Sequence, residues 1–73
     1  MIGNNLKILR KKNNITQVEF SAILGIAQTT YAGYESDKHD PDLKTLIKIA
    51  DYFNTSTDFI LDRYNSHKSI NEL

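Results

Sequence analysis

The chain has 73 residues, of which 40% are hydrophobic and 25% are charged. A domain of this length holds one small core and no large active-site cavity, which excludes barrels and two-domain enzymes. Because there is no cysteine, disulfides, thiolate zinc sites and cysteine nucleophiles are excluded. No apolar run in the sequence approaches the roughly 20 residues needed to span a membrane. The start, from Met1 to Asn5, lacks the basic-then-apolar pattern of a secretion signal, so we expect a cytoplasmic protein.

The net charge is zero, but the charges are unevenly distributed. The first fifteen residues carry four basic side chains and no acidic one, whereas residues 16–37 carry three acidic side chains and no basic one. Bulk charge therefore does not dictate a partner, and any contact with a polyanion depends on where individual side chains lie.

The pattern predicts helices separated by short polar breaks. The first helix is expected from Gly3 to Lys12. The second begins at Thr16, which forms a T-x-x-E capping box with Glu19. It stops at Gly25, because glycine has no Cβ and adopts the left-handed conformation of a helix end at little energetic cost. The apolar residues at helical spacing are Ile2, Leu6 and Leu9 in the first helix and Phe20, Ile23 and Leu24 in the second.

Three further helices are expected. The third covers about Gln28 to Glu35, with Tyr31 and Tyr34 on its inner side. Asp42 caps a fourth helix, Leu43 to Phe53, which turns Leu46, Ile47, Ala50 and Phe53 inward. Ser56 caps a short fifth helix that includes Phe59, Ile60 and Leu61. Residues 1–62 then form the domain, and residues 63–73 form a tail that is frayed, a weak extra helix or part of a partner contact.

The segment from Thr16 to Ser36 fits a helix-turn-helix, because two short helices flank a turn at residues 25–27. Ser21 is small where the second helix crosses the third. The apolar residues that wedge the two helices at a fixed angle are Phe20, Leu24, Ile26, Tyr31 and Tyr34. Such a rigid pair can project its second helix into the major groove of DNA, which is wide enough for one α-helix.

Motifs along most of the chain, from Leu6 to Leu61, resemble the phage repressor/Cro-type helix-turn-helix family, also called the XRE type. The matching pieces, in order, are Leu6–Arg10, Thr16–Gln17, Gly25, Tyr34–Glu35, Pro41–Leu43, Leu46–Phe53 and Ser56–Leu61. The resemblance implies an all-α, compact five-helix, lambda-repressor-like domain. It further implies a sequence-specific transcriptional regulator, expected to be a repressor that binds a two-fold DNA operator as a homodimer.

Residue roles follow from the same resemblance. The expected base contacts are Gln28 and Thr29, assisted by Ala27 and Thr30. The expected phosphate contacts are Gln17, Ser36, Lys38 and Lys11. Arg10 and Glu35 are expected to form a structural ion pair between the first and third helices. The apolar residues Phe59, Ile60, Leu61 and Tyr64 are candidate contacts of a two-fold dimer.

Three positions depart from the family pattern. The family often has a capping Ser or Thr at the position of Ala27, and a missing cap costs about 0.5–2 kcal/mol. It often has a long polar side chain at the position of Gly33, where close approach to DNA or a partner would explain the glycine. It usually has glycine at the position of Asp37, which tolerates the left-handed conformation better than most residues.

Other interpretations are weaker. Lys7, Lys11 and Lys12 are a solvated helix face unless one of them contacts phosphate. The aromatic residues Tyr31, Tyr34 and Phe53 fit a core better than a stacking platform for single strands. His39 and His67 have no partner at metal-ligand spacing, and no catalytic motif is present, so we expect no metal, cofactor or enzymatic activity. The rival from another class is an antitoxin-like protein-interaction module.

Overall fold

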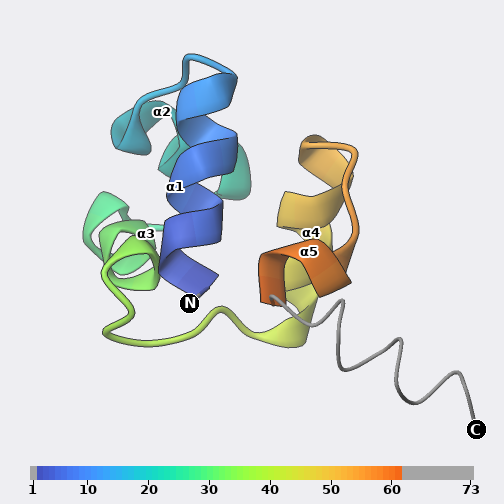
Figure 1. The fold of residues 1–73 in the computed structure, drawn as a ribbon. Helices are drawn as coiled ribbons and strands as arrows, with labels where there is room; N and C mark the ends of the chain where they lie inside the picture. Colours follow the sequence, from blue (N-terminus) through green and yellow to red (C-terminus); the bar gives the residue numbers. More distant parts are fainter. Residues whose placement is uncertain (1, 62–73) are drawn as a thin grey trace, which may run out of the picture.

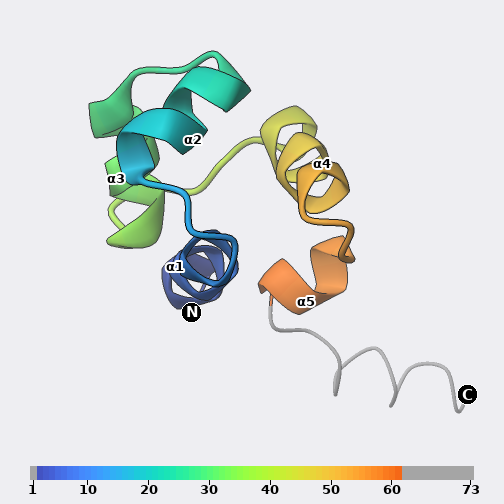
Figure 2. The same ribbon diagram turned by 90° about the horizontal axis from the view of Figure 1, so that it is seen from above.

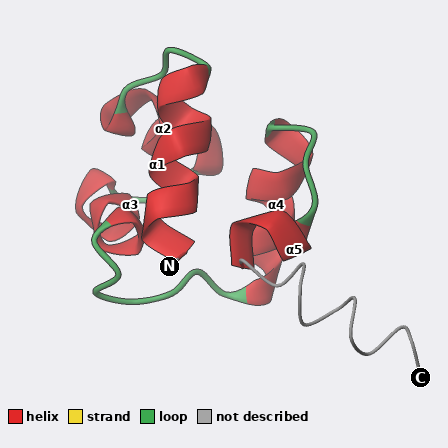
Figure 3. Cartoon of the chain, viewed as in Figure 1, coloured by secondary structure: helices red, strands yellow, loops and turns green. Residues whose placement is uncertain are grey.

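A computed structural model describes residues 2–61 and shows five helices in this range (Figure 1). They are α1 (Ile2–Lys12), α2 (Gln17–Leu24), α3 (Gln28–Glu35), α4 (Leu43–Tyr52) and α5 (Thr57–Leu61). Loops connect them, and residues 2–61 contain no strand (Figure 3). The predicted all-α class with five helices is thus confirmed. The tail at 63–73, including the candidate dimer contact Tyr64, lies outside the described residues.

The helices begin and end where the capping signals predicted. The backbone amide of Glu19 donates to the Thr16 hydroxyl at 3.1 Å, and its carboxylate accepts from the Thr16 amide at 2.9 Å. Gly25 ends α2 in the left-handed region with φ of 73°. The side chains of Asp42 and Ser56 each accept from the amide three residues later, at 2.9 and 3.1 Å. Local signals therefore fix the turns on both sides of α2 and the starts of α4 and α5.

Each helix packs closely against at least two others, so that the five enclose a single core. The most extensive contacts join α1 with α3, α3 with α2, α2 with α4, α4 with α5, and α5 with α1. The buried apolar residues are Leu6, Phe20, Leu24, Tyr31, Tyr34, Leu46, Ile49, Ala50 and Ile60. Tyr31 and Tyr34 therefore belong to the core, as predicted, and Phe53 packs half-buried against it.

Two residues placed inward by the sequence pattern are half exposed. Ile23 is 47% exposed and Ile47 is 45% exposed. In α2 the buried stripe runs through Phe20, Ser21 and Leu24, because α3 packs against this side. In α4 the buried stripe is Leu46, Ile49 and Ala50. Each misplaced isoleucine is the direct neighbour of a buried leucine and lies about 100° away from it around the helix.

The predicted dimer surface also needs a correction. Ile60 has no exposed surface, because its side chain is part of the core. It cannot contribute to an exposed apolar patch. Phe59 and Leu61 are partly buried and pack against the same core. The Asn5 side chain of α1 holds α5 in place by donating to the carbonyl oxygens of Phe59 and Ile60, at 3.1 and 3.0 Å.

The N-terminus of α1 lies against the C-terminal end of α3. A Cβ at Gly3 would clash with the backbone carbonyl groups of Tyr34 and Glu35, so only glycine allows this approach. Asp37, just after α3, adopts a left-handed φ of 61°. Its carboxylate accepts from the Gly3 amide at 2.9 Å, a favourable position for a negative charge at a helix N-terminus. Asp37 thus stands in for the usual glycine and adds a cap to α1.

Candidate nucleic-acid interface

The α2–turn–α3 unit is held together by aromatic packing. The rings of Phe20 and Tyr31 meet edge to face with their centroids 5.3 Å apart, a favourable geometry for an aromatic pair. Ser21 is buried and its hydroxyl donates to the Val18 carbonyl oxygen at 2.8 Å. Ile26, in the turn, packs against the core. Viewed from above, α2 and α3 lie together on one side of the molecule (Figure 2). The two helices and their turn thus form a helix-turn-helix unit packed on the core.

The beginning of α3 is turned to the outside. Ala27, Gln28 and Thr29 are exposed and Thr30 is half-buried, while the opposite side of the helix buries Tyr31. Ala27 occupies the N-cap position without a side-chain hydrogen bond to the helix, as its residue type implied. Three of the four predicted base contacts are therefore exposed at the N-terminal turn of α3, and the fourth, Thr30, is half-buried.

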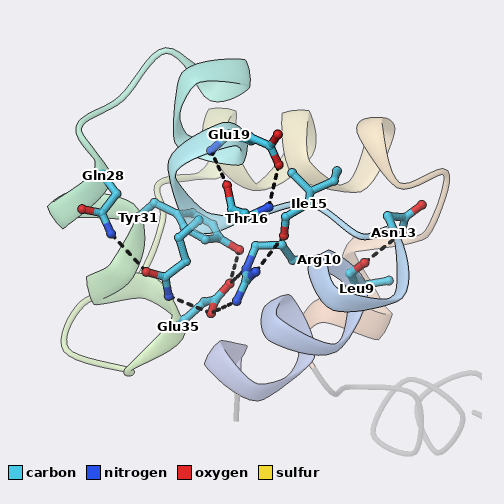
Figure 4. A network of polar contacts seen from close by, with 10 residues as sticks. Leu9, Arg10, Asn13, Ile15, Thr16, Glu19, Gln28, Tyr31 and Glu35 are labelled. Atoms are coloured by element: carbon cyan, nitrogen blue, oxygen red, sulfur yellow. Dashed lines mark hydrogen bonds and ion pairs between the residues drawn. The ribbon is translucent and has the colours of Figure 1, made fainter.

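The predicted ion pair between α1 and α3 is present (Figure 4). Arg10 Nε donates to Glu35 Oε2 at 2.6 Å and Arg10 Nη2 donates to Glu35 Oε1 at 3.1 Å. The two side chains are only 10% and 4% exposed. Arg10 Nη1 also donates to the Ile15 carbonyl oxygen at 2.7 Å, and the Tyr31 hydroxyl donates to Glu35 Oε2 at 2.7 Å. This bidentate geometry compensates both buried charges.

A chain of amide hydrogen bonds links this ion pair to the outward turn of α3. Gln17 Nε2 donates to Glu35 Oε1 at 3.0 Å, and Gln28 Nε2 donates to Gln17 Oε1 at 3.2 Å. A carboxylate can only accept, so the orientation of the Gln17 amide is fixed, and its oxygen must face Gln28. The second N–H and the oxygen of the Gln28 amide are left to bind something else.

Electrostatics favour the charged form of the pair. Burial raises the pKa of the Glu35 carboxyl, but the hydrogen bonds from Arg10, Tyr31 and Gln17 together lower it by more, so this pKa lies below its usual value. The hydrogen bond to Glu35 raises the pKa of Arg10. Burial, followed by the bond to Glu35, raises the pKa of Tyr31 far above its usual value. The Tyr31 hydroxyl therefore stays protonated and donates.

The lowered pKa of Glu35 predicts acid sensitivity. A carboxyl whose pKa is lower in the folded state stabilises the fold above its unfolded pKa of roughly 4.3, and this stabilisation is lost as the pH falls through the folded pKa. Glu35→Gln should be less stable than the parent at pH 7, because Arg10 is left uncompensated, and should lose less stability between pH 5 and pH 3. Thermal unfolding of both proteins across this range tests the prediction. Parallel acid profiles would contradict it.

The predicted phosphate contacts are arranged unequally around α3. Gln17 is joined to Gln28 by the hydrogen bond just described. Ser36 and Lys38 are exposed in the segment after α3, but the Ser36 hydroxyl already donates to the Gly33 carbonyl oxygen at 3.2 Å. Lys11 is exposed on α1. Of the four, the structure directly connects only Gln17 to the predicted base contacts.

Sequence reasoning missed several polar contributors. The Tyr31 hydroxyl, four residues before Glu35, could have been found, because side chains at this spacing meet on a helix. The α1 cap by Asp37 and the contact of His39 with the carbonyl oxygen of Thr30 depend on the path of a loop and leave no local signal. Within residues 2–61, His, Cys, Asp and Glu side chains form no group of three that could hold a metal ion, and no helix is long and apolar enough to cross a membrane.

Comparison with known proteins decides the family. The profile of the helix-turn-helix family matches residues 6–60. The chain belongs to the Cro/C1-type helix-turn-helix family. It is 45% identical over 60 residues to the HTH-type transcriptional regulator AnsR of Bacillus subtilis, covering 82% of this chain and 52% of AnsR. It is 36% identical over its whole length to YonR, a regulator from the SPbeta prophage of the same organism, covering 68% of YonR.

Two further proteins that are similar to this chain have different roles by their names. The transcriptional repressor RstR of the cryptic phage CTXphi in Vibrio cholerae is 38% identical over 63 residues, which are 86% of this chain and 56% of RstR. The antitoxin PezA of Streptococcus pneumoniae is 38% identical over 56 residues, which are 77% of this chain and 35% of PezA. The chain thus spans about half the length of AnsR and RstR and a third of PezA.

Proposed function

We propose that this helix-turn-helix chain is a sequence-specific DNA-binding regulator of transcription that inserts the N-terminal turn of α3 into the major groove. The observation that carries the proposal is the Gln28 side chain, exposed at this turn and tied through Gln17 to the buried ion pair. A base-reading side chain whose orientation is set in advance loses less entropy on binding. The transcriptional regulators among the relatives support the same function.

The recognition chemistry follows from the donors and acceptors of α3. The free N–H and oxygen of the Gln28 amide match adenine N7 and N6, which form one bidentate pair in the major groove. The hydroxyl or methyl group of Thr29 reads a neighbouring base, and Ala27 packs on a thymine methyl group. Thr30 assists from the side of the helix. These uncharged groups favour an operator with A·T pairs at the centre of the contact.

Phosphate contacts set the position on the backbone. The first amides of α2 at Gln17 point out of the helix N-terminus, where geometry and dipole favour an anion. Lys38, Ser36 and Lys11 add contacts around the groove. Such contacts strengthen binding to all sequences, because phosphates carry no base information.

We further infer that the chain acts as a repressor, the role that RstR has by its name, and that it binds DNA as a homodimer. One domain of this size makes too few contacts for high selectivity, whereas a two-fold pair doubles them. Two α3 helices about 34 Å apart would meet one face of the duplex, one turn apart. Sedimentation with and without an inverted-repeat duplex tests this: two chains per duplex are expected, and a single bound chain on the repeat would refute the dimer.

Gln28→Ala and Lys38→Ala should have different effects on binding to duplexes selected from a random library. Gln28→Ala should cost about 1–3 kcal/mol on the preferred duplex and relax the preference at one base pair. Lys38→Ala should weaken binding to all duplexes alike and make the dependence on salt less steep. Titrations at two salt concentrations with selected and scrambled duplexes make the comparison. Unchanged selectivity in Gln28→Ala would refute the base-reading role.

The similarity to PezA supports a second candidate, an antitoxin-like module whose main partner is another protein. The two candidates give opposite results in paired experiments. Selection from random duplexes should enrich one motif if the chain is a DNA regulator. Affinity capture by the parent should then retain no stoichiometric protein partner. A partner that binds Gln28→Ala and the parent equally, together with no enriched motif, would favour the antitoxin-like module.

A further inference from the structure

The side of α3 that continues from Thr29 is occupied by a histidine from outside the helix. Gly33 lies four residues after Thr29, and residues at this spacing share one side of a helix. Thr29 is exposed, but Gly33 is buried. A Cβ at Gly33 would clash with the imidazole ring of His39. The ring therefore fills the position where a side chain of residue 33 would begin.

Several contacts hold the ring in this place. His39 Nε2 lies 3.1 Å from the carbonyl oxygen of Thr30. The ring meets Tyr34 edge to face, with centroids 5.4 Å apart and planes at 86°. The segment after α3 folds back on the helix, because the amides of Lys38 and His39 donate to the Gly33 carbonyl oxygen at 2.9 and 3.4 Å. His39 nevertheless remains exposed.

The hydrogen bond to Thr30 determines what the ring can offer to a ligand. A carbonyl oxygen only accepts, so Nε2 must carry the hydrogen, and the neutral ring then has Nδ1 as an acceptor. In the major groove, an acceptor pairs with the exocyclic amino groups of adenine or cytosine. The ring thus supplies a polar group at Gly33, which has no side chain of its own and lies one helical turn after Thr29.

We propose that His39 is a specificity-determining residue that reads a base edge from the position of the missing side chain at Gly33. The absence of a Cβ at residue 33 is what admits the ring. This inference rests on the proposed function, because it needs α3 in the major groove. A residue from the α3–α4 loop would thus read DNA together with the N-terminal turn of α3. Glycine at position 33 is then explained by the room that the His39 ring needs.

The test is selection from a random duplex library with the parent, His39→Ala, Gly33→Ala and the double variant. His39→Ala should lose about three- to tenfold discrimination at a base pair next to those affected by Gln28→Ala, as expected for one hydrogen bond. Gly33→Ala should change the same base pair, because the added methyl group displaces the flexible ring. The double variant should lose no more than His39→Ala. Lys38→Ala serves as the control that alters affinity without altering the motif.

Each result has one interpretation once thermal unfolding has shown that the variants fold. An unchanged motif in His39→Ala overturns the proposal. A uniform loss of affinity for all duplexes also overturns it, because it would assign His39 only to the phosphate backbone or to loop packing. If the parent itself enriches no motif, the proposed DNA-binding function fails, and this failure is distinct from that of the His39 inference.

Discussion

Arg10→Met is expected to lower the free energy of unfolding by about 3–5 kcal/mol, because it leaves the Glu35 carboxylate buried without its charged partner. The Glu35 side chain is only 4% exposed, so water does not replace the lost guanidinium. A chain of 73 residues has a total stability of about 4–11 kcal/mol. The variant should therefore be close to unfolded at moderate temperature and should bind DNA weakly.

Urea unfolding and thermal unfolding of Arg10→Met measure this effect. Lys11→Met is the matched control, since Lys11 is the next residue on α1 and is exposed. Its stability should change by at most about 0.5 kcal/mol, as is usual at the surface. If Arg10→Met unfolds like the parent and loses only DNA affinity, Arg10 is a DNA contact and the structural ion pair contributes nothing.

Phe20→Ala is expected to lower the free energy of unfolding by about 3–5 kcal/mol, the usual effect of removing a buried aromatic ring. Phe20 is fully buried, and its ring contacts Tyr31 of α3, Tyr52 of α4 and Phe53 at centroid distances of 5.3, 5.3 and 4.9 Å. The substitution removes the wedge that joins the helix-turn-helix unit to the rest of the core. The free energy of unfolding should fall, and α3 should no longer be held in the same orientation.

Ile23→Ala is the control for this second prediction. It lies on the same helix and in the same predicted apolar stripe, but it is 47% exposed. Ile23→Ala should lower the free energy of unfolding by less than about 1 kcal/mol, since the Ile23 side chain buries little apolar surface. Denaturant titrations of the two variants side by side make the measurement. Similar losses for Phe20→Ala and Ile23→Ala would mean that α2 packs with a different side toward the core.

The local part of this fold could be predicted from the sequence. Thr16 with Glu19, Gly25 and Asp42 mark helix ends through hydrogen bonds made within a few residues, and the structure contains them all. The side of a short helix that faces the core depends instead on the crossing of its neighbours. For that reason the apolar pattern places Ile23 on the wrong side, although it predicts the helix itself correctly.

The contacts of the candidate site could likewise be predicted only in part. The family resemblance was sufficient to predict the pairing of Arg10 with Glu35, whose side chains come from distant positions in the chain. The bond between Gln17 and Gln28 was not predicted, because it depends on the separation of two helix starts. The placement of His39 over Gly33 was not predicted either, since a loop's path is set by the whole fold.

The central claim is that the N-terminal turn of α3 enters the DNA groove. Amide chemical shifts of the labelled chain, followed during titration with a selected duplex at 150 mM salt, test it most directly. The largest changes should fall at residues 27–30, with smaller ones at the start of α2 and in the segment after α3. If the largest changes fell on α4 and α5 while Gln28 and Thr29 stayed unchanged, the chain would use another surface and the claim would be wrong.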